Sequence, residues 1–298
     1  MSSTLFIGLG RMGAPMAIQH ARSFHTVVFD LASDTAERVA AKSDAVALSS
    51  LSDMPESIDT IILMLPSSRE VEELLVGRGD LLTLIKRDSI IIDMGSSEPE
   101  STRRLAAQAG GFGIAYVDAP VSGGVPKAAT GELSILVGGA DAHVARALPH
   151  LRTMGSKIIP VGDVGTGDVA KAVNNLVSAT NIAVACEALS IAESSGISRE
   201  RMAEVLNSST GRSQASELKL TEYVIPRNFT SGFAYDLMLK DMAIAVGLET
   251  STRTPVTRSA FDVLKRGRAS LGTEPDHTEI GRLYGLGDPP IAGEGLSP

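Results

Sequence analysis

Cysteine is nearly absent from this chain of 298 residues, which contains a single one, Cys186. One cysteine cannot close an internal disulfide, and it has no neighbouring cysteine with which to build a zinc site. The five histidines are scattered and lack the spacing of metal ligands. The sequence therefore predicts neither a disulfide framework nor a bound metal, and Cys186 is predicted to be a core residue.

Positive charge is also scarce, with 27 Lys and Arg against 35 Asp and Glu, a formal net charge of −8. This balance disfavours nucleic acid and anionic membrane surfaces as partners, but it leaves room for a local basic site that binds an anionic substrate. We find no internal repeat and no apolar run long enough to cross a bilayer. A strand that begins at Thr4 leaves no room for a targeting peptide. The expected location is therefore cytoplasmic, or mitochondrial only if a transit peptide has been removed.

The chain is long enough for two domains, and 43% of its residues are hydrophobic. Its first half alternates strand-like and helix-like runs, whereas its second half shows helical spacing almost throughout. This pattern predicts an α/β fold, with a Rossmann-type doubly wound parallel sheet over residues 1–164 and an all-α domain over residues 165–284. A long helix, apolar nearly all round, is predicted at the junction, over residues 168–194. A disordered tail is predicted for residues 285–298, where Gly and Pro dominate.

A glycine-rich turn joins the first predicted strand to the first predicted helix. A strand at residues 4–10 precedes it, a helix at residues 14–23 follows, and the next strand, residues 26–30, ends in an acidic residue. In this context Gly-x-Gly-x-x-Gly is a strong signal for a dinucleotide, whose phosphates lie at the positive end of the helix. The residues of this turn that we predict to bind the cofactor are Gly8, Leu9, Gly10, Arg11, Met12 and Gly13.

Asp30 ends the second predicted strand and is predicted to accept hydrogen bonds from the adenosine ribose. Its charge would repel a 2′-phosphate, and Leu31 stands where an arginine could bind that phosphate. The sequence therefore favours NAD over NADP. A loop or helix-cap aspartate is the alternative interpretation of Asp30.

Two further strands, at residues 59–66 and 88–95, end in loop-forming residues. In open α/β sheets ligands bind beyond the carboxyl ends of the strands. We therefore predict that Leu65, Pro66 and Ser96 contact the nicotinamide half of the cofactor. Ordinary turn residues without a ligand are the alternative for each of them.

Two more motifs point to a small anion and to proton transfer. Ser122, Gly123 and Gly124 offer successive backbone N–H groups and a hydroxyl, which suit an anion, although the same residues make plain turns readily. Lys171 and Asn175 are four residues apart and share one face of the junction helix. A lysine at the head of a buried helix is costly unless it has a function or a partner, so a salt-bridged or snorkelling lysine is the alternative.

Together these residues resemble the β-hydroxyacid dehydrogenase family, of the 3-hydroxyisobutyrate dehydrogenase type. The resemblance covers residues 4–284 and is carried by residues 8–16, 118–124 and 165–175 and by Lys240-Asp241. It implies that Lys171 is the catalytic acid/base and that Lys240 lies near the nicotinamide. It also implies that Ser122, Gly123, Gly124 and Asn175 hold the substrate, and that the helical domain builds homodimers or homotetramers.

The resemblance further implies hydride transfer between a nicotinamide cofactor and a small anionic β-hydroxyacid. Our first expectation is 3-hydroxyisobutyrate, in valine catabolism; the alternative is tartronate semialdehyde or a sugar acid such as threonate. Ser96 departs from the threonine of many relatives, and Arg212 could bind either a second substrate group or a neighbouring subunit. A non-catalytic dinucleotide-binding module and an imine-reducing relative are disfavoured, because such proteins would be expected to lose Lys171.

Overall fold

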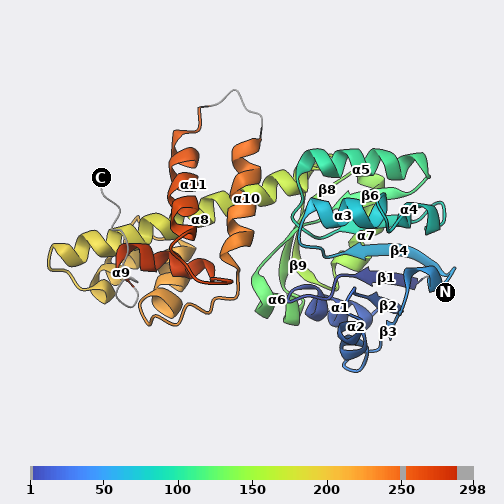
Figure 1. Ribbon diagram of the computed structural model, residues 1–298, viewed down its shortest axis with the longest axis horizontal. Helices are drawn as coiled ribbons and strands as arrows, with labels where there is room; N and C mark the ends of the chain where they lie inside the picture. The colour runs from blue at the N-terminus through green and yellow to red at the C-terminus, as the bar shows by residue number, and fades with distance from the viewer. Residues whose placement is uncertain (1–2, 249–252, 287–298) are drawn as a thin grey trace. The chain divides into compact units, whose positions relative to one another are not determined.

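The computed structural model describes residues 3–248 and 253–286 (Figure 1). The chain forms two compact units, Met1–Lys171 and Ala172–Pro298. Their boundary falls inside the long helix α8 (Thr166–Ser194), whereas the predicted boundary lies just before this helix begins. All but the first two residues of the predicted disordered tail lie outside the described residues.

Unit 1 is built on a sheet whose strand order is β3-β2-β1-β4-β5-β6-β8-β7, with β9 paired to β8. The first six strands pair in parallel; β8 runs antiparallel to β6 and β7, and β9 is parallel to β8. The strand bounds are β1 Ser3–Ile7, β2 Thr26–Phe29, β3 Val46–Ala47, β4 Ile58–Leu63, β5 Ile90–Asp93, β6 Ala115–Asp118, β7 Val121–Ser122, β8 Leu133–Gly138 and β9 Gly155–Gly162.

The order 3-2-1-4-5-6 is that of a Rossmann-type sheet, which confirms the predicted fold class. The antiparallel edge formed by β7 and β8 was not predicted. The connection between these two strands, residues 123–132, is shorter than the dozen or so residues that a parallel crossover needs. The chain therefore returns beside β7 in the opposite direction.

Helices cover both faces of this sheet, so its strands are buried on both sides (Figure 1). Leu5 and Phe6 are neighbours on β1 and point to opposite faces, yet both are fully buried, in two separate core clusters. The helices of this unit are α1 Gly13–Ala21, α2 Ser33–Ala40, α3 Ser68–Leu75, α4 Leu81–Leu84, α5 Pro99–Gly111, α6 Gly124–Thr130 and α7 Asp141–Leu151, with a short 3₁₀ turn, η1, at Leu51–Asp53.

The secondary structure of unit 2 is helical among its described residues, as predicted, apart from an isolated β-bridge between Ala234 and Asp276. Most of α8 runs through it, followed by α9 Arg199–Ser208, the π-helix η2 Ala215–Val224, α10 Tyr235–Gly247, α11 Pro255–Arg268 and the 3₁₀-helix η3 His277–Tyr284. Its core gathers apolar side chains from all of these helices. Cys186 is fully buried in that core, which confirms its prediction as a core residue.

Helix α8 is long and apolar enough, by length and composition, to cross a membrane, with a mean hydropathy of 1.3 over its best window. The expectation that no run reaches this length was therefore wrong. The helix meets the criterion because Lys171 is the only charged residue between Asp168 and Glu187. The core helix of a soluble protein meets the same criterion, and Ile182 and Leu189 of α8 pack in the core of unit 2.

Candidate active site

The glycine turn after β1 has the geometry that a bound pyrophosphate needs. Gly8 has a φ of 91°, and a Cβ there would lie 2.4 Å from the carbonyl oxygen of Met64. A Cβ on Gly13 would lie 1.9 Å from the carbonyl oxygen of Gly8. Around Gly10, by contrast, a Cβ would meet no heavy atom within 4 Å, and this residue is exposed. The first and third glycines therefore permit close packing, and the second leaves open backbone where phosphates can approach.

Asp30 ties the end of β2 to this turn. Its two carboxylate oxygens accept hydrogen bonds from the Leu9 N–H (2.7 Å) and the Ala32 N–H (2.9 Å). A carboxylate has further lone pairs, so these two bonds leave capacity for the hydroxyls of a ribose. The neighbouring Leu31 is 97% exposed and offers no cation to a 2′-phosphate. The residues present therefore fit the adenosine half of NAD.

The loops after β4 and β5 lie against the glycine turn, as the parallel sheet predicts. A Cβ on Gly8 would come within 3.0 Å of the Leu65 side chain, and one on Gly95 within 2.8 Å of the Leu65 carbonyl oxygen. Pro66 is exposed, and Ser96 is partly buried directly after Gly95. The three loops thus meet at the carboxyl edge of the sheet, while each individual cofactor contact stays a prediction.

Ser122, Gly123 and Gly124 make the turn from β7 into α6, in which Ser122 ends the strand and Gly124 begins the helix. Gly123 has a φ of 138° and Gly124 a φ of 73°, a backbone region that favours glycine in both positions. The Lys127 side chain passes next to this turn, because a Cβ on Gly123 would lie 2.8 Å from its Cδ. The turn presents consecutive N–H groups with no side chain on two of its residues, which suits the predicted anion.

The head of α8 is held by a carboxylate from the end of β6. Asp118 accepts the Gly165 N–H on Oδ1 (2.7 Å) and the Asp168 N–H on Oδ2 (3.1 Å). These are two of the N–H groups that a helix leaves without a partner at its start. The first turn of α8 is therefore attached to the carboxyl edge of the sheet.

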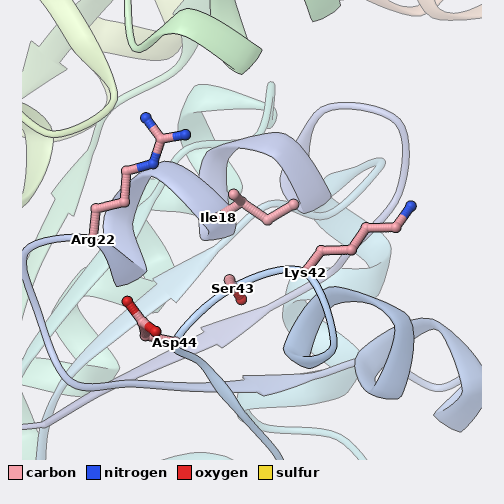
Figure 2. Close-up of a pocket in the computed structure, with 5 residues that line it drawn as sticks. All are labelled: Ile18, Arg22, Lys42, Ser43 and Asp44. Atoms are coloured by element: carbon pink, nitrogen blue, oxygen red, sulfur yellow. The ribbon is translucent and has the colours of Figure 1, made fainter.

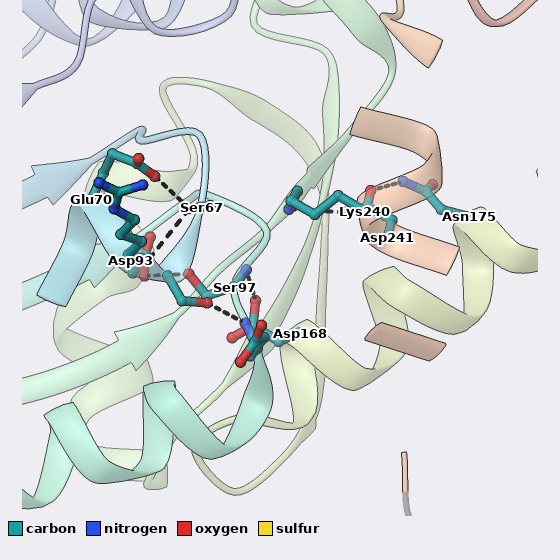
Figure 3. A network of polar contacts seen from close by, with 11 residues as sticks. Ser67, Glu70, Asp93, Ser97, Asp168, Asn175, Lys240 and Asp241 are labelled. Carbon is teal, nitrogen blue, oxygen red and sulfur yellow. Dashed lines mark hydrogen bonds and ion pairs between the residues drawn. The ribbon is translucent and has the colours of Figure 1, made fainter. Parts of the chain in front are cut away.

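A second attachment joins α8 to the loop that contains Ser96. Asp168 accepts the Ser97 N–H on Oδ1 (3.0 Å) and the Thr102 hydroxyl on Oδ2 (2.7 Å); Figure 3 shows Asp168 beside Ser97. Lys171 follows Asp168 by about one helical turn and is partly buried. The structure therefore ties the helix that carries the predicted acid/base to a loop that is predicted to contact the cofactor.

Three buried carboxyl groups cluster around this attachment. Burial raises the pKa of Asp93 to about 6 and raises the pKa of Asp118. Burial, followed by the charges of Asp93 and Asp118, raises the pKa of Asp168 well above its usual range. The Tyr116 hydroxyl donates to Asp93 (3.1 Å). Sequence reasoning missed this cluster, although Asp93 and Asp118 each follow an apolar strand run directly, which was a usable signal.

In unit 2, one buried carboxylate connects two of the predicted site residues. The Asn175 Nδ2 donates to Asp241 Oδ2 (2.5 Å), and Asp241 Oδ1 lies 3.0 Å from Lys240 Nζ (Figure 3). Asp241 is only 2% exposed, so the Lys240-Asp241 pair is not the solvated edge that its sequence left open. The Asn175 Oδ1 accepts from the neighbouring Asn174 Nδ2 (3.1 Å), so the Asn175 amide is oriented at both ends.

Two other features lie away from these residues. Arg212 is exposed, with its Nη1 3.5 Å from Glu217 Oε1. A cavity of about 330 Å³ lies at the far end of α1 from the glycine turn (Figure 2). It is lined by Ile18, Arg22, Lys42, Ser43 and Asp44, and it shares no residue with the predicted site. Among the described residues no group of three or more His, Cys, Asp or Glu is placed to hold a metal ion.

Comparison with known proteins covers both units. Residues 4–162 match the family described as the NAD binding domain of 6-phosphogluconate dehydrogenase. Residues 165–284 match the family described as NAD-binding of NADP-dependent 3-hydroxyisobutyrate dehydrogenase.

Individual relatives agree over nearly the whole chain. The 2-(hydroxymethyl)glutarate dehydrogenase of Eubacterium barkeri is 40% identical over 273 residues, 90% of each chain. The 2-hydroxy-3-oxopropionate reductase of Escherichia coli (strain K12) is 33% identical over 277 residues, 92% of this chain and 94% of that protein. The structure of Mycobacterium tuberculosis 3-hydroxyisobutyrate dehydrogenase with L-serine superposes with a TM-score of 0.86 at 30% identity, and it covers 95% of this chain and 98% of its own.

The matched families account for the glycine turn, the Rossmann-type sheet and the helical second unit together. All three of these relatives are named as enzymes that act on hydroxyacids or their oxo counterparts. The chain therefore belongs to the β-hydroxyacid dehydrogenase family, the NAD(P)-dependent oxidoreductases that act on CH–OH donors.

Proposed function

We propose that this enzyme oxidises 3-hydroxyisobutyrate to methylmalonate semialdehyde, in valine catabolism, with Lys171 as the acid/base. The observation that carries the proposal is the placement of Lys171 one turn into α8, on a helix head tied by Asp168 to the loop of Ser96. The name of the family matched by residues 165–284 and the 0.86 TM-score of the M. tuberculosis enzyme support this substrate.

The proposed chemistry needs one proton acceptor and one anion site. The bound nicotinamide supplies the hydride acceptor. Lys171, as a neutral amine, takes the hydroxyl proton during oxidation and returns it as an ammonium in the reverse direction. The Ser122 hydroxyl and the N–H groups of Gly123 and Gly124 bind the substrate carboxylate. Such positioning of an acid/base relative to a reacting carbon can contribute several kcal/mol, up to roughly 7–11, to lowering the barrier.

NAD is the proposed cofactor rather than NADP. The Asp30 carboxylate carries a negative charge where a 2′-phosphate would lie, and Leu31 supplies no cation to offset it. We expect kcat/KM with NAD to exceed that with NADP by at least about tenfold, which corresponds to roughly 1.4 kcal/mol of discrimination.

Reduction of tartronate semialdehyde is the second candidate. The E. coli relative named 2-hydroxy-3-oxopropionate reductase, 33% identical over 92% of this chain, favours it. The E. barkeri relative, at 40% identity, adds a branched dicarboxylate to the compounds worth testing. A panel of 3-hydroxyisobutyrate, glycerate, threonate and 2-(hydroxymethyl)glutarate, each assayed with NAD and NADP by absorbance of the reduced cofactor, separates these substrates.

We also propose that the enzyme is a homodimer or homotetramer and that it is cytoplasmic. Val177, Val184 and Ile191 recur every seven residues on α8, so they lie along one side of this helix. They are 53%, 55% and 62% exposed in the single chain. An apolar stripe of this kind on one helix is a typical contact between two copies of a chain.

Replacement of Lys171 is the direct test of the catalytic proposal. For Lys171→Ala we expect kcat to fall roughly 10²–10⁴-fold, because proton transfer loses its acid/base. The dissociation constant of NADH, measured by isothermal titration calorimetry, should stay within about twofold, since Lys171 is proposed to act on the substrate hydroxyl and is not among the residues predicted to bind the cofactor. Full activity of this variant would refute the role of Lys171. If the unsubstituted protein bound NADH but turned over no acid of the panel, that result would instead support a non-catalytic module.

A further inference from the structure

Helix α8 begins without a capping side chain of its own. The residue before its first turn is Gly165, which has no side chain, and the Thr166 hydroxyl donates backwards to the Asp163 carbonyl (2.7 Å). Ser, Thr, Asp and Asn are the residues preferred at this position, because their side-chain oxygen accepts one of the first N–H groups. Here Asp118, 47 residues earlier in the chain, accepts the Gly165 N–H, and it also accepts the Asp168 N–H.

The Asp118 carboxylate is closely surrounded by the backbone of two glycines. A Cβ on Gly167 would lie 2.6 Å from Asp118 Oδ2, and a Cβ on Gly138 would lie 2.6 Å from Asp118 Oδ1. A Cβ on Gly167 would also lie 2.7 Å from the Leu136 carbonyl oxygen. Asp118 itself is 1% exposed. Two glycines, one on β8 and one on α8, therefore enclose the carboxylate so tightly that no side chain could replace either hydrogen without a shift of backbone or of Asp118.

The negative charge of Asp118 is also favoured at this position, the start of a helix. The N-terminus of a helix carries a partial positive charge, which stabilises an anion. Burial raises the pKa of Asp118, whereas the hydrogen bonds from Gly165, Asp168 and Gly167 act in the opposite direction. The carboxylate thus holds two N–H groups at the start of α8, while Asp168 ties the same turn to Ser97 and Thr102.

We propose that Asp118 is a positioning residue for Lys171: it replaces the missing cap of α8 and thereby sets where the Lys171 amine lies relative to the substrate. This inference rests on the proposed role of Lys171 as the acid/base. Asp118 acts through the helix and takes no proton itself. A displacement of about 1 Å in a catalytic group can lower the rate about 10²-fold, so a loosened helix head is sufficient to impair turnover.

The test is the substitution Asp118→Asn, which keeps the shape but replaces one acceptor oxygen by an NH₂ group. Either the Gly165 N–H or the Asp168 N–H then faces a donor. We expect kcat for the best hydroxyacid of the panel to fall at least about tenfold, whereas KM for NAD changes less than about threefold, because the glycine turn is untouched. The matched control is Tyr116→Phe, on the same strand, which removes a buried hydrogen bond to Asp93 but none to α8. It should keep kcat within about threefold.

A double-mutant cycle separates positioning from general damage to the fold. If Asp118 acts through Lys171, Asp118→Asn should change the residual kcat of Lys171→Ala by less than about twofold, although it lowers that of the unsubstituted enzyme at least tenfold. The same fold-loss in both backgrounds, or an equal loss in Tyr116→Phe, would overturn the inference. A fully active Lys171→Ala would instead overturn the proposed function itself, so the two failures are distinguishable.

A second variant covers the case in which Asp118→Asn does not fold. In Asp118→Ser the new side chain is smaller than aspartate, so it fits the space, and its hydroxyl oxygen can accept a hydrogen bond from one of the two N–H groups. We expect it to give a folded enzyme, checked by circular dichroism, with a kcat below that of Tyr116→Phe and an unchanged KM for NAD. A kcat equal to that of Tyr116→Phe would overturn the inference.

Discussion

At the scale of single residues, unit 1 contains a histidine pair whose protonation is set by its neighbours. Thr26 donates its hydroxyl to the Phe24 carbonyl (2.9 Å), so at His20 Nδ1 (2.9 Å) it must accept, and His20 carries its proton on Nδ1. His20 Nε2 then accepts from His150 Nδ1 (3.0 Å). A second proton on His20 would sit on Nε2 and point at the N–H of His150. Burial, and then the charge of His150, lower the pKa of His20 to about 3.

This pair predicts a specific pH dependence of stability. The pKa of His20 in the folded protein lies below its unfolded value of 6.5, so its stabilising contribution is present above pH 6.5 and is lost as the pH falls toward 3. Between pH 7 and pH 5 the unsubstituted protein should lose about 2 kcal/mol more of its unfolding free energy than His20→Gln does. Urea unfolding at the two pH values measures the difference. Identical pH dependences would contradict the prediction.

A buried carboxyl group and an exposed histidine also bear on the pH dependence of stability. The raised pKa of Asp93, about 6, acts in the opposite direction: its contribution is present below the unfolded pKa of 3.8 and is lost as the pH rises through 6. The prediction is therefore a difference between two proteins in which Asp93 is unchanged. His25→Gln is the control, because His25 is exposed, and it should leave the pH dependence as it is in the unsubstituted protein.

At the scale of elements, two glycines of the turn between β1 and α1 have different roles, although both belong to the same Gly-x-Gly-x-x-Gly pattern. A Cβ on Gly13 would lie 1.9 Å from the Gly8 carbonyl oxygen, so α1 could not stay against β1. A Cβ on Gly10 would meet nothing within 4 Å, but it would point into space that the cofactor phosphates are predicted to use.

We therefore expect the two alanine substitutions to separate folding from binding. Gly13→Ala should lower the free energy of unfolding by about 1–3 kcal/mol, as overpacking does. Gly10→Ala should leave it within about 1 kcal/mol, a typical bound for an exposed position, yet weaken NADH binding at least tenfold. Urea unfolding and isothermal titration calorimetry of both variants measure the two effects. Similar stability losses in both would show that the packing difference has no energetic consequence.

At the scale of the whole molecule, the apolar stripe of α8 predicts self-association. Val184→Glu and Ile191→Glu place a carboxylate on the stripe, and burying an unpaired charge at an interface costs several kcal/mol. We expect these variants to sediment as monomers under conditions in which the unsubstituted enzyme is a dimer or tetramer. Val46→Glu, at a valine of unit 1 that is 52% exposed, is the control and should not change the mass. A monomeric unsubstituted enzyme would refute the proposed assembly.

Much of the fold and the kind of cofactor could be predicted because the signals are local. The glycine turn, the acidic end of β2 and the alternation of strands with helices all lie within short windows of sequence, where backbone sterics and side-chain period determine the structure. The antiparallel edge at β7 and β8 was missed, because it depends on how a short connection folds back. The apolar length of α8 was underestimated: its few polar residues are scattered, so the helix is apolar enough on average to span a bilayer although no uninterrupted apolar run is that long.

The sequence by itself determined the class of fold, the kind of cofactor and the family, since each rests on residues close together along the chain. Only the tertiary structure decided which partners the buried polar groups have. Asp118 meets Gly165, His20 meets His150, and Asn175 meets Asp241 across 47, 130 and 66 residues. Hydrogen bonds and burial are properties of neighbours in space, and those neighbours exist only once the sheet and the helices have packed.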